Sequence, residues 1–154
     1  MVADTPKVRM VHLLDALQTM VRRIYGPNGC IWAQEQTHYT LWRHVRAEAG
    51  EVVQVLKEIG PVPLPANFTA ETVSPQLAQH LAEELGDLLF QVLVHADLAE
   101  REGLFTLGDV LEVLQAKLVR RHPHVLGSRT AHTLDDVEEI WTEAKTQERM
   151  RRDG

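Results

Sequence analysis

Apolar residues recur every three or four positions through most of this chain, which is the spacing of one face of a helix. No segment shows the sustained alternation of apolar and polar residues that is typical of a strand. The pattern predicts helices over residues 8–25, 39–59 and 74–102, a fourth that begins at Thr106 and is broken by "RHPH" (121–124), and a fifth that begins at Thr133. We therefore expect an all-α fold, a helical bundle of about five helices.

Three of the predicted helix starts carry residues that are typical of N-caps. Ser74 is followed by Pro75, and proline suits the first position of a helix because its missing N–H would have no partner there. Thr106 and Thr133 are each followed three residues later by an aspartate, which is the spacing of a capping box. These caps support the helix boundaries that the apolar pattern predicts.

Two of the predicted helices carry acids on their apolar faces. Glu48 falls on the apolar stripe of the second helix, and Glu51 follows it by three residues. Glu84 interrupts the leucine stripe of the third helix, and Asp87 follows it by three. Each helix therefore presents two acids on adjacent turns of one face. If the two helices pack side by side, four carboxylates meet at one place.

Four ionised carboxylates in a partly buried place repel one another, and a divalent cation relieves that repulsion better than protons do. Ligation by oxygen alone favours Mg²⁺, Mn²⁺ or Ca²⁺. A single pair of acids at this spacing is more often a solvated helix surface, so the prediction depends on finding two pairs. A ferritin-like di-iron site would need two Glu-x-x-His motifs, and the chain has only "EQTH" (35–38).

A basic segment, "KLVRRHPH" (117–124), lies at the end of the fourth predicted helix and contains Lys117, Arg120 and Arg121. Basic residues at this end of a helix are also explained by its dipole. Together with a metal site, however, they suggest phosphate chemistry, in which cations neutralise the phosphate oxygens. The chain has no Walker loop and no Rossmann glycine pattern.

Composition narrows the choice of protein class. The chain has 154 residues, of which 44% are hydrophobic and 25% charged, so we expect a single globular domain over residues 1–154 with flexible ends at 1–8 and 149–154. It has no apolar run long enough for a transmembrane helix. The net charge of −6 disfavours nucleic-acid binding. A single cysteine, Cys30, and an N-terminus without a secretory signal predict a cytoplasmic location.

Several motifs, in this order, make the chain resemble the MazG-type nucleoside triphosphate pyrophosphohydrolases, over roughly residues 11–148. They are "GCIWAQEQTH", "EAGEVV", "EELGDLLFQVLVHA", "KLVRRHPHV" and "IWTEAK". The resemblance implies Mg²⁺- or Mn²⁺-dependent hydrolysis of a nucleoside triphosphate to the monophosphate and pyrophosphate. It also implies a homodimer, so that a four-helix core would be completed by dimerisation and the nucleotide site would lie near the subunit interface.

The resemblance assigns roles to individual residues. It implies that the catalytic metal ligands are Glu48, Glu51, Glu84 and Asp87, and that substrate binds to Lys117, Arg121, the adjacent Arg120, Trp141 and Lys145. Trp141 and Lys145 are four residues apart and thus on one helix face. Trp141 would stack on a base, although a tryptophan here also suits a core or dimer contact.

The chain departs from the family pattern at three positions. Ala47 stands where the family has the first acid of "EEAYE", and Ile31 and Ala33 replace the proline and aspartate of "GCPWD". Because the acid at position 47 would orient water or hold a second ion, we expect slow turnover. Two alternatives therefore stay open: a weakly active or non-catalytic module that binds nucleotide and metal, and a pyrophosphatase specialised for a damaged or deoxy nucleotide.

Overall fold

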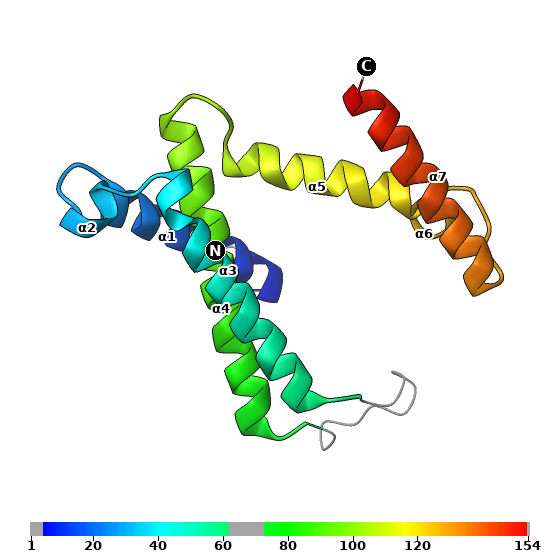
Figure 1. Cartoon of the computed structure of the whole chain (residues 1–154), viewed down its shortest axis with the longest axis horizontal. Helices are drawn as coiled ribbons and strands as arrows, with labels where there is room; N and C mark the ends of the chain where they lie inside the picture. Colours follow the sequence, from blue (N-terminus) through cyan, green and yellow to red (C-terminus); the bar gives the residue numbers. More distant parts are fainter. Residues whose placement is uncertain (1–4, 62–72, 154) are drawn as a thin grey trace. The chain divides into compact units, whose positions relative to one another are not determined.

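A computed structural model describes residues 5–61 and 73–153 (Figure 1). The helices of this part of the chain are α1 (Pro6–Tyr25), α2 (Ile31–Gln34), α3 (His38–Ile59), α4 (Pro75–Arg101), α5 (Leu107–Arg121), α6 (Pro123–Leu126) and α7 (Leu134–Asp153). No strand occurs in these residues, which confirms the all-α prediction. The five long helices correspond to the five predicted segments, whereas α2 and α6, of four residues each, were not predicted.

The three predicted N-caps form hydrogen bonds that confirm them. The Ser74 hydroxyl accepts a backbone N–H from the first turn of α4. At the start of α5, Thr106 Oγ1 accepts the N–H of Asp109, while Asp109 Oδ2 accepts the N–H of Thr106 at 2.7 Å. Thr133 and Asp136 exchange the same two bonds at the start of α7, at 3.1 and 2.9 Å. Each box satisfies backbone donors that a helix start would otherwise leave unpaired.

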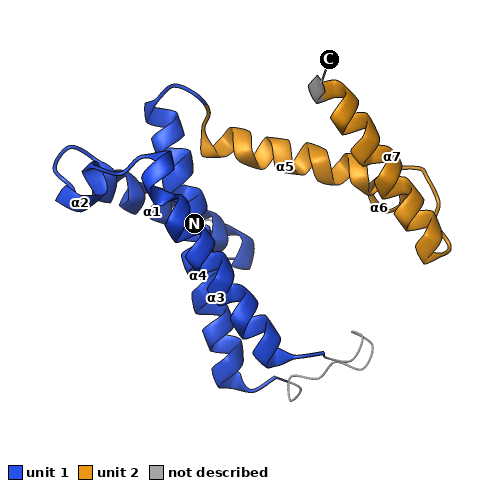
Figure 2. Cartoon of the chain, in the orientation of Figure 1, with its two compact units in different colours: residues 1–104 blue, residues 105–154 orange. Residues whose placement is uncertain are grey.

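The chain divides into two compact units, residues 1–104 and residues 105–154 (Figure 2). In the first unit α3 and α4 lie side by side and α1 packs against α4; in the second, α5 packs against α7. The expectation of one domain over residues 1–154 stays a prediction. Of the ends expected to be flexible, residues 6–8 belong to α1 and residues 149–153 to α7, while residues 1–4 and 154 lie outside the described part.

The apolar core of the first unit lies along the C-terminal half of α4. The buried residues of α4 all fall between Gln91 and Ala99, and those of α3 are Leu41, Val52 and Val55. The N-terminal half of α4, which carries Glu84 and Asp87, has no buried residue. On α3 the buried residues therefore flank Glu48 on both sides, whereas on α4 they all lie on the C-terminal side of Glu84 and Asp87.

A buried ionic group fixes α1 against α4. Asp97 is only 7% exposed, and it pairs with Arg101 at 2.5 Å and with Arg22 at 4.0 Å. Burial raises the pKa of Asp97, and the two arginines oppose that shift. Arg101 in turn donates to the backbone carbonyls of Tyr25 and Arg22, which belong to the last turn of α1. These carbonyls have no partner within their own helix, so Arg101 caps α1 from the neighbouring helix.

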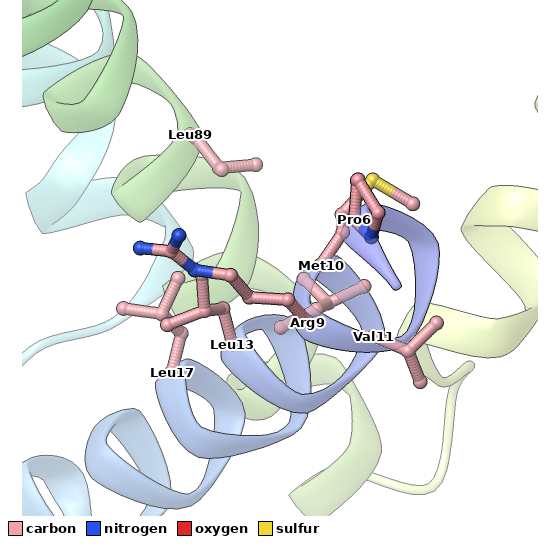
Figure 3. Close-up of a pocket in the computed structure, with 8 residues that line it drawn as sticks. Pro6, Arg9, Met10, Val11, Leu13, Leu17 and Leu89 are labelled. Carbon is pink, nitrogen blue, oxygen red and sulfur yellow. The ribbon is translucent and has the colours of Figure 1, made fainter. Parts of the chain in front are cut away.

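The N-terminal half of α1 carries apolar side chains that are largely uncovered. A groove of about 620 Å³ is lined by residues of α1 together with Leu89 of α4 (Figure 3). Its exposed apolar residues include Met10, Val11, Leu13 and Leu17, each at least 40% exposed. Among the described helices, none combines the length and apolar character that crossing a bilayer requires.

Candidate active site

The packing of α3 against α4 brings the predicted acids together. Ligand oxygens of Glu48, Glu84 and Asp87 lie within 4.8 Å of one another. Glu48 is half-buried, Asp87 is exposed, and the side chain of Glu84 is only 13% exposed. Because Glu48 and Glu84 both interrupt apolar stripes, the two helices turn these acids toward each other when their apolar faces meet.

The fourth predicted acid, Glu51, lies beside the same cluster. Its pKa is raised, chiefly by the neighbouring carboxyl group of Glu84 and further by the negative charges of Glu48 and Asp87. The four acids therefore form one electrostatically coupled group.

The two oxygens of Glu84 have different surroundings. Oε1 lies 3.0 Å from Nε2 of His80, one turn earlier on α4. Oε2 is buried and, among the described residues, has no hydrogen-bond partner. A buried carboxylate oxygen without a partner is costly, and a hard cation would satisfy it. The donors present, all of them carboxylate oxygens, fit Mg²⁺ or Mn²⁺. The sequence analysis missed His80, although its spacing of four residues from Glu84 was a usable signal.

The predicted basic and aromatic residues gather in the second unit. A cavity of about 390 Å³ between α5 and α7 is lined by Leu114, Lys117, Leu118, Arg121, His122, Trp141 and Lys145. Three cations and one indole thus face a hollow large enough for part of a small ligand. Trp141 is 39% exposed, and its ring meets the ring of His122 edge-on, with centroids 6.0 Å apart.

Arg120, also predicted as a binding residue, does not line this cavity. It donates instead to Glu148 of α7, at 3.2 Å, and Arg121 donates to the same carboxylate at 2.6 Å. The hydrogen bond from Arg121, with that from Arg120, lowers the pKa of Glu148, so this carboxylate is firmly ionised. Sequence reasoning missed Glu148, because 27 residues separate it from Arg121 and no local spacing signals the contact.

Comparison with known proteins identifies a family. The sequence model of the "MazG nucleotide pyrophosphohydrolase domain" matches residues 36–126. "Nucleoside triphosphate pyrophosphohydrolase/pyrophosphatase MazG" of Thermotoga maritima is 31% identical over 142 residues, covering 92% of this chain and 49% of that protein. "Nucleoside triphosphate pyrophosphohydrolase" of Escherichia coli K12 is 34% identical over 140 residues, covering 90% and 47%.

"Uncharacterized protein YabN" of Bacillus subtilis is 34% identical over 140 residues, covering 91% of this chain and 25% of YabN. The chain thus spans half or less of the length of these three relatives. No solved structure matches the chain.

The acid cluster predicts a response of folding stability to metal. Mg²⁺ or Mn²⁺ should raise the melting temperature, because an ion that binds only the folded state stabilises it by mass action. Glu84→Gln should abolish this rise and leave the metal-free protein as stable as the wild type or more so, since one repelling charge is gone. Thermal melts with and without MnCl₂ measure both effects.

The matched control is Glu83→Gln, which removes the neighbouring charge on the same helix. Glu83 is exposed and accepts a hydrogen bond from Gln79, and it does not belong to the acid cluster. This variant should keep the metal response. If Glu84→Gln keeps it too, the metal does not bind at this cluster.

Proposed function

Because the chain belongs to the MazG nucleotide pyrophosphohydrolase family, we propose that it hydrolyses nucleoside triphosphates to nucleoside monophosphate and pyrophosphate. The observation that carries the proposal is the acid cluster at the packed faces of α3 and α4, with an unpartnered carboxylate oxygen inside it. Such a cluster is costly for the folded protein unless it binds a cation, and a triphosphate is a substrate that a cation activates.

Glu48, Glu51, Glu84 and Asp87 would hold the metal, which we propose to be Mg²⁺ or Mn²⁺. When bound, such an ion polarises phosphate oxygens and neutralises part of their charge. The chain's own contribution is to keep ligand oxygens of Glu48, Glu84 and Asp87 within 4.8 Å of one another on two helices before the ion arrives.

Lys117, Arg121 and Lys145 would bind the phosphates, because they are the cations that line the cavity of the second unit. Their charges would stabilise the negative charge that develops on pyrophosphate as it leaves. Trp141 lines the same cavity, and its exposed ring offers a surface on which a nucleobase can stack. The predicted role of Arg120 as a direct ligand has less support, since Arg120 does not line the cavity.

The proposal includes a homodimer. The uncovered apolar side of α1 would be buried by a second copy, because exposed apolar groups at this density favour association. It also includes a cytoplasmic location, in keeping with a single exposed cysteine that has no partner for a disulfide. The acidic net charge supports a small nucleotide, rather than a nucleic acid, as the ligand.

The activity is tested by measuring pyrophosphate release from a panel of canonical, deoxy and damaged nucleoside triphosphates. With Mg²⁺ we expect pyrophosphate and monophosphate in equal amounts from several of them, and no release by Glu84→Gln. Release from one substrate alone would identify a specialised pyrophosphatase. Triphosphate binding without any turnover, or release of inorganic phosphate in place of pyrophosphate, would contradict the proposal.

The alanine at position 47 leads us to expect a low turnover number for triphosphate hydrolysis. Position 47 is exposed and lies one helical turn before Glu51, so a glutamate there would stand beside the acid cluster. Ala47→Glu should raise the turnover number of a slow wild type while leaving substrate affinity nearly unchanged, since a positioned base contributes about 10²–10⁴-fold. Single-turnover hydrolysis at saturating Mg²⁺ measures the difference. Tyr39→Glu, which adds the same charge at an exposed position of α3 more than two turns before Glu48, should not raise the turnover number. A fast wild type that Ala47→Glu does not improve would contradict this prediction.

The dimer predicts a mass of about twice the 17.4 kDa of one chain in light scattering. Leu13→Asp should convert it to the monomer, because the charge would be buried in the apolar groove of α1. Met150→Asp is the control, since Met150 is an exposed apolar residue outside that groove. A wild type that is monomeric at every concentration would refute the dimer.

A further inference from the structure

Arg120 and Arg121 are adjacent in sequence and share one partner, yet only one of them faces the cavity. Arg121 donates to Glu148 through two nitrogens, from Nε to Oε1 at 3.4 Å and from Nη2 to Oε2 at 2.6 Å. Arg120 donates from Nη2 to Oε1 at 3.2 Å. Arg121 lines the cavity, whereas Arg120 and Glu148 do not. The carboxylate therefore holds the guanidinium of Arg121 from outside the cavity.

This geometry leaves the Nη1 end of the Arg121 guanidinium free to bind a ligand. The carboxylate occupies the edge of the guanidinium formed by Nε and Nη2, and the Nη1 end makes no hydrogen bond to any described residue. Two bonds to one planar carboxylate fix both the direction and the plane of the guanidinium. The pair is partly shielded from water, since the side chains of Arg121 and Glu148 are 26% and 21% exposed. A long side chain that is otherwise mobile is thereby held in one orientation.

We propose that Glu148 is a positioning residue for the anion-binding cavity: with Arg120, it holds the guanidinium of Arg121 so that its Nη1 end meets a phosphate group of the ligand. Arg120 then acts as a second tether for Glu148 and does not bind the ligand. This inference rests on the proposed function, because it takes the cavity lined by Lys117, Arg121, Trp141 and Lys145 as the triphosphate site. Holding a cation in place before the ligand arrives raises affinity, because less side-chain freedom is lost on binding.

A different role for Glu148 would be that of an internal competitor, a carboxylate that occupies Arg121 until a phosphate displaces it. In that case Glu148 would stand on the cavity side of the guanidinium, where the phosphate binds. The residues that line the cavity argue against this, because Glu148 is not among them. The two roles predict opposite effects on affinity, which makes them separable by experiment.

The decisive variant is Glu148→Asp, which keeps the charge but shortens the side chain by one methylene. We expect it to weaken binding of inorganic triphosphate, measured by calorimetry, by roughly tenfold, the loss associated with one charged hydrogen bond. Glu143→Asp is the matched control, because Glu143 lies on the same helix, pairs with Arg129 at 2.5 Å and does not line the cavity. It should bind triphosphate as the wild type does. Both variants should keep wild-type amide hydrogen exchange in α5 and α7, which a loss of structure in the second unit would not allow.

Unchanged or tighter binding of triphosphate by Glu148→Asp would overturn the inference. A wild type that binds no triphosphate would overturn the proposed function instead, and the inference with it. A crystal structure of the wild type with inorganic triphosphate provides a second test that needs no variant. It should keep Glu148 on the Nε and Nη2 edge of Arg121 with a phosphate at Nη1; a phosphate in place of Glu148 would refute the positioning role.

Discussion

Repulsion among carboxylates is the constraint around which the first unit is organised. Glu48 and Glu84 stand where apolar residues would otherwise complete the contact between α3 and α4. The two helices stay together because apolar residues are buried on either side of the acids, at Leu41, Val52 and Val55 on α3 and between Gln91 and Ala99 on α4. Burial of these apolar residues thus offsets the repulsion among the carboxylates. A cation that binds at the cluster removes this repulsion, and the free energy released adds to the affinity of the protein for that cation.

In the second unit, positively charged side chains lie near one another. Lys117, Arg121 and Lys145 face one cavity, and they would repel each other as the acids do. Here the chain supplies one counter-charge of its own, Glu148, and places it outside the cavity. The cavity keeps its positive character while its most directional donor is held by an ion pair.

Much of this arrangement follows from local patterns in the sequence. The five long helices, their capping boxes and the inward direction of Glu84 all depend on residues three or four positions apart, and a helix makes such residues neighbours whatever the rest of the chain does. The grouping of Glu48, Glu84 and Asp87 needed one further assumption, that two amphipathic helices pack by their apolar faces. That assumption holds for α3 and α4.

The features that escaped prediction depend on contacts between distant residues. Glu148 meets Arg121 only because α7 folds back on α5, and Arg101 caps α1 only because Asp97 holds it there. The helices α2 and α6 have four residues each, too few for an apolar period to be recognised. Side chains on α1 such as Leu13 have the spacing of a core face but lie exposed, because periodicity indicates which residues share a face and not what covers it.

The uneven burial of α4 also has a consequence for its motions. At 1.5 Å per residue this helix is about 40 Å long, and about 20 Å separates Glu84 from Asp97. Hydrogen bonds in the half anchored by Asp97 open only when most of the unit unfolds, whereas those around Glu84 can open locally, since no residue of that half is buried. Amide hydrogen exchange should therefore slow from the N-terminal to the C-terminal half of this one helix. A metal ion bound between Glu84 and Glu48 would hold the N-terminal half of α4 against α3. Amide exchange in that half would then slow, and the difference in exchange rate between the two halves of the helix would become smaller.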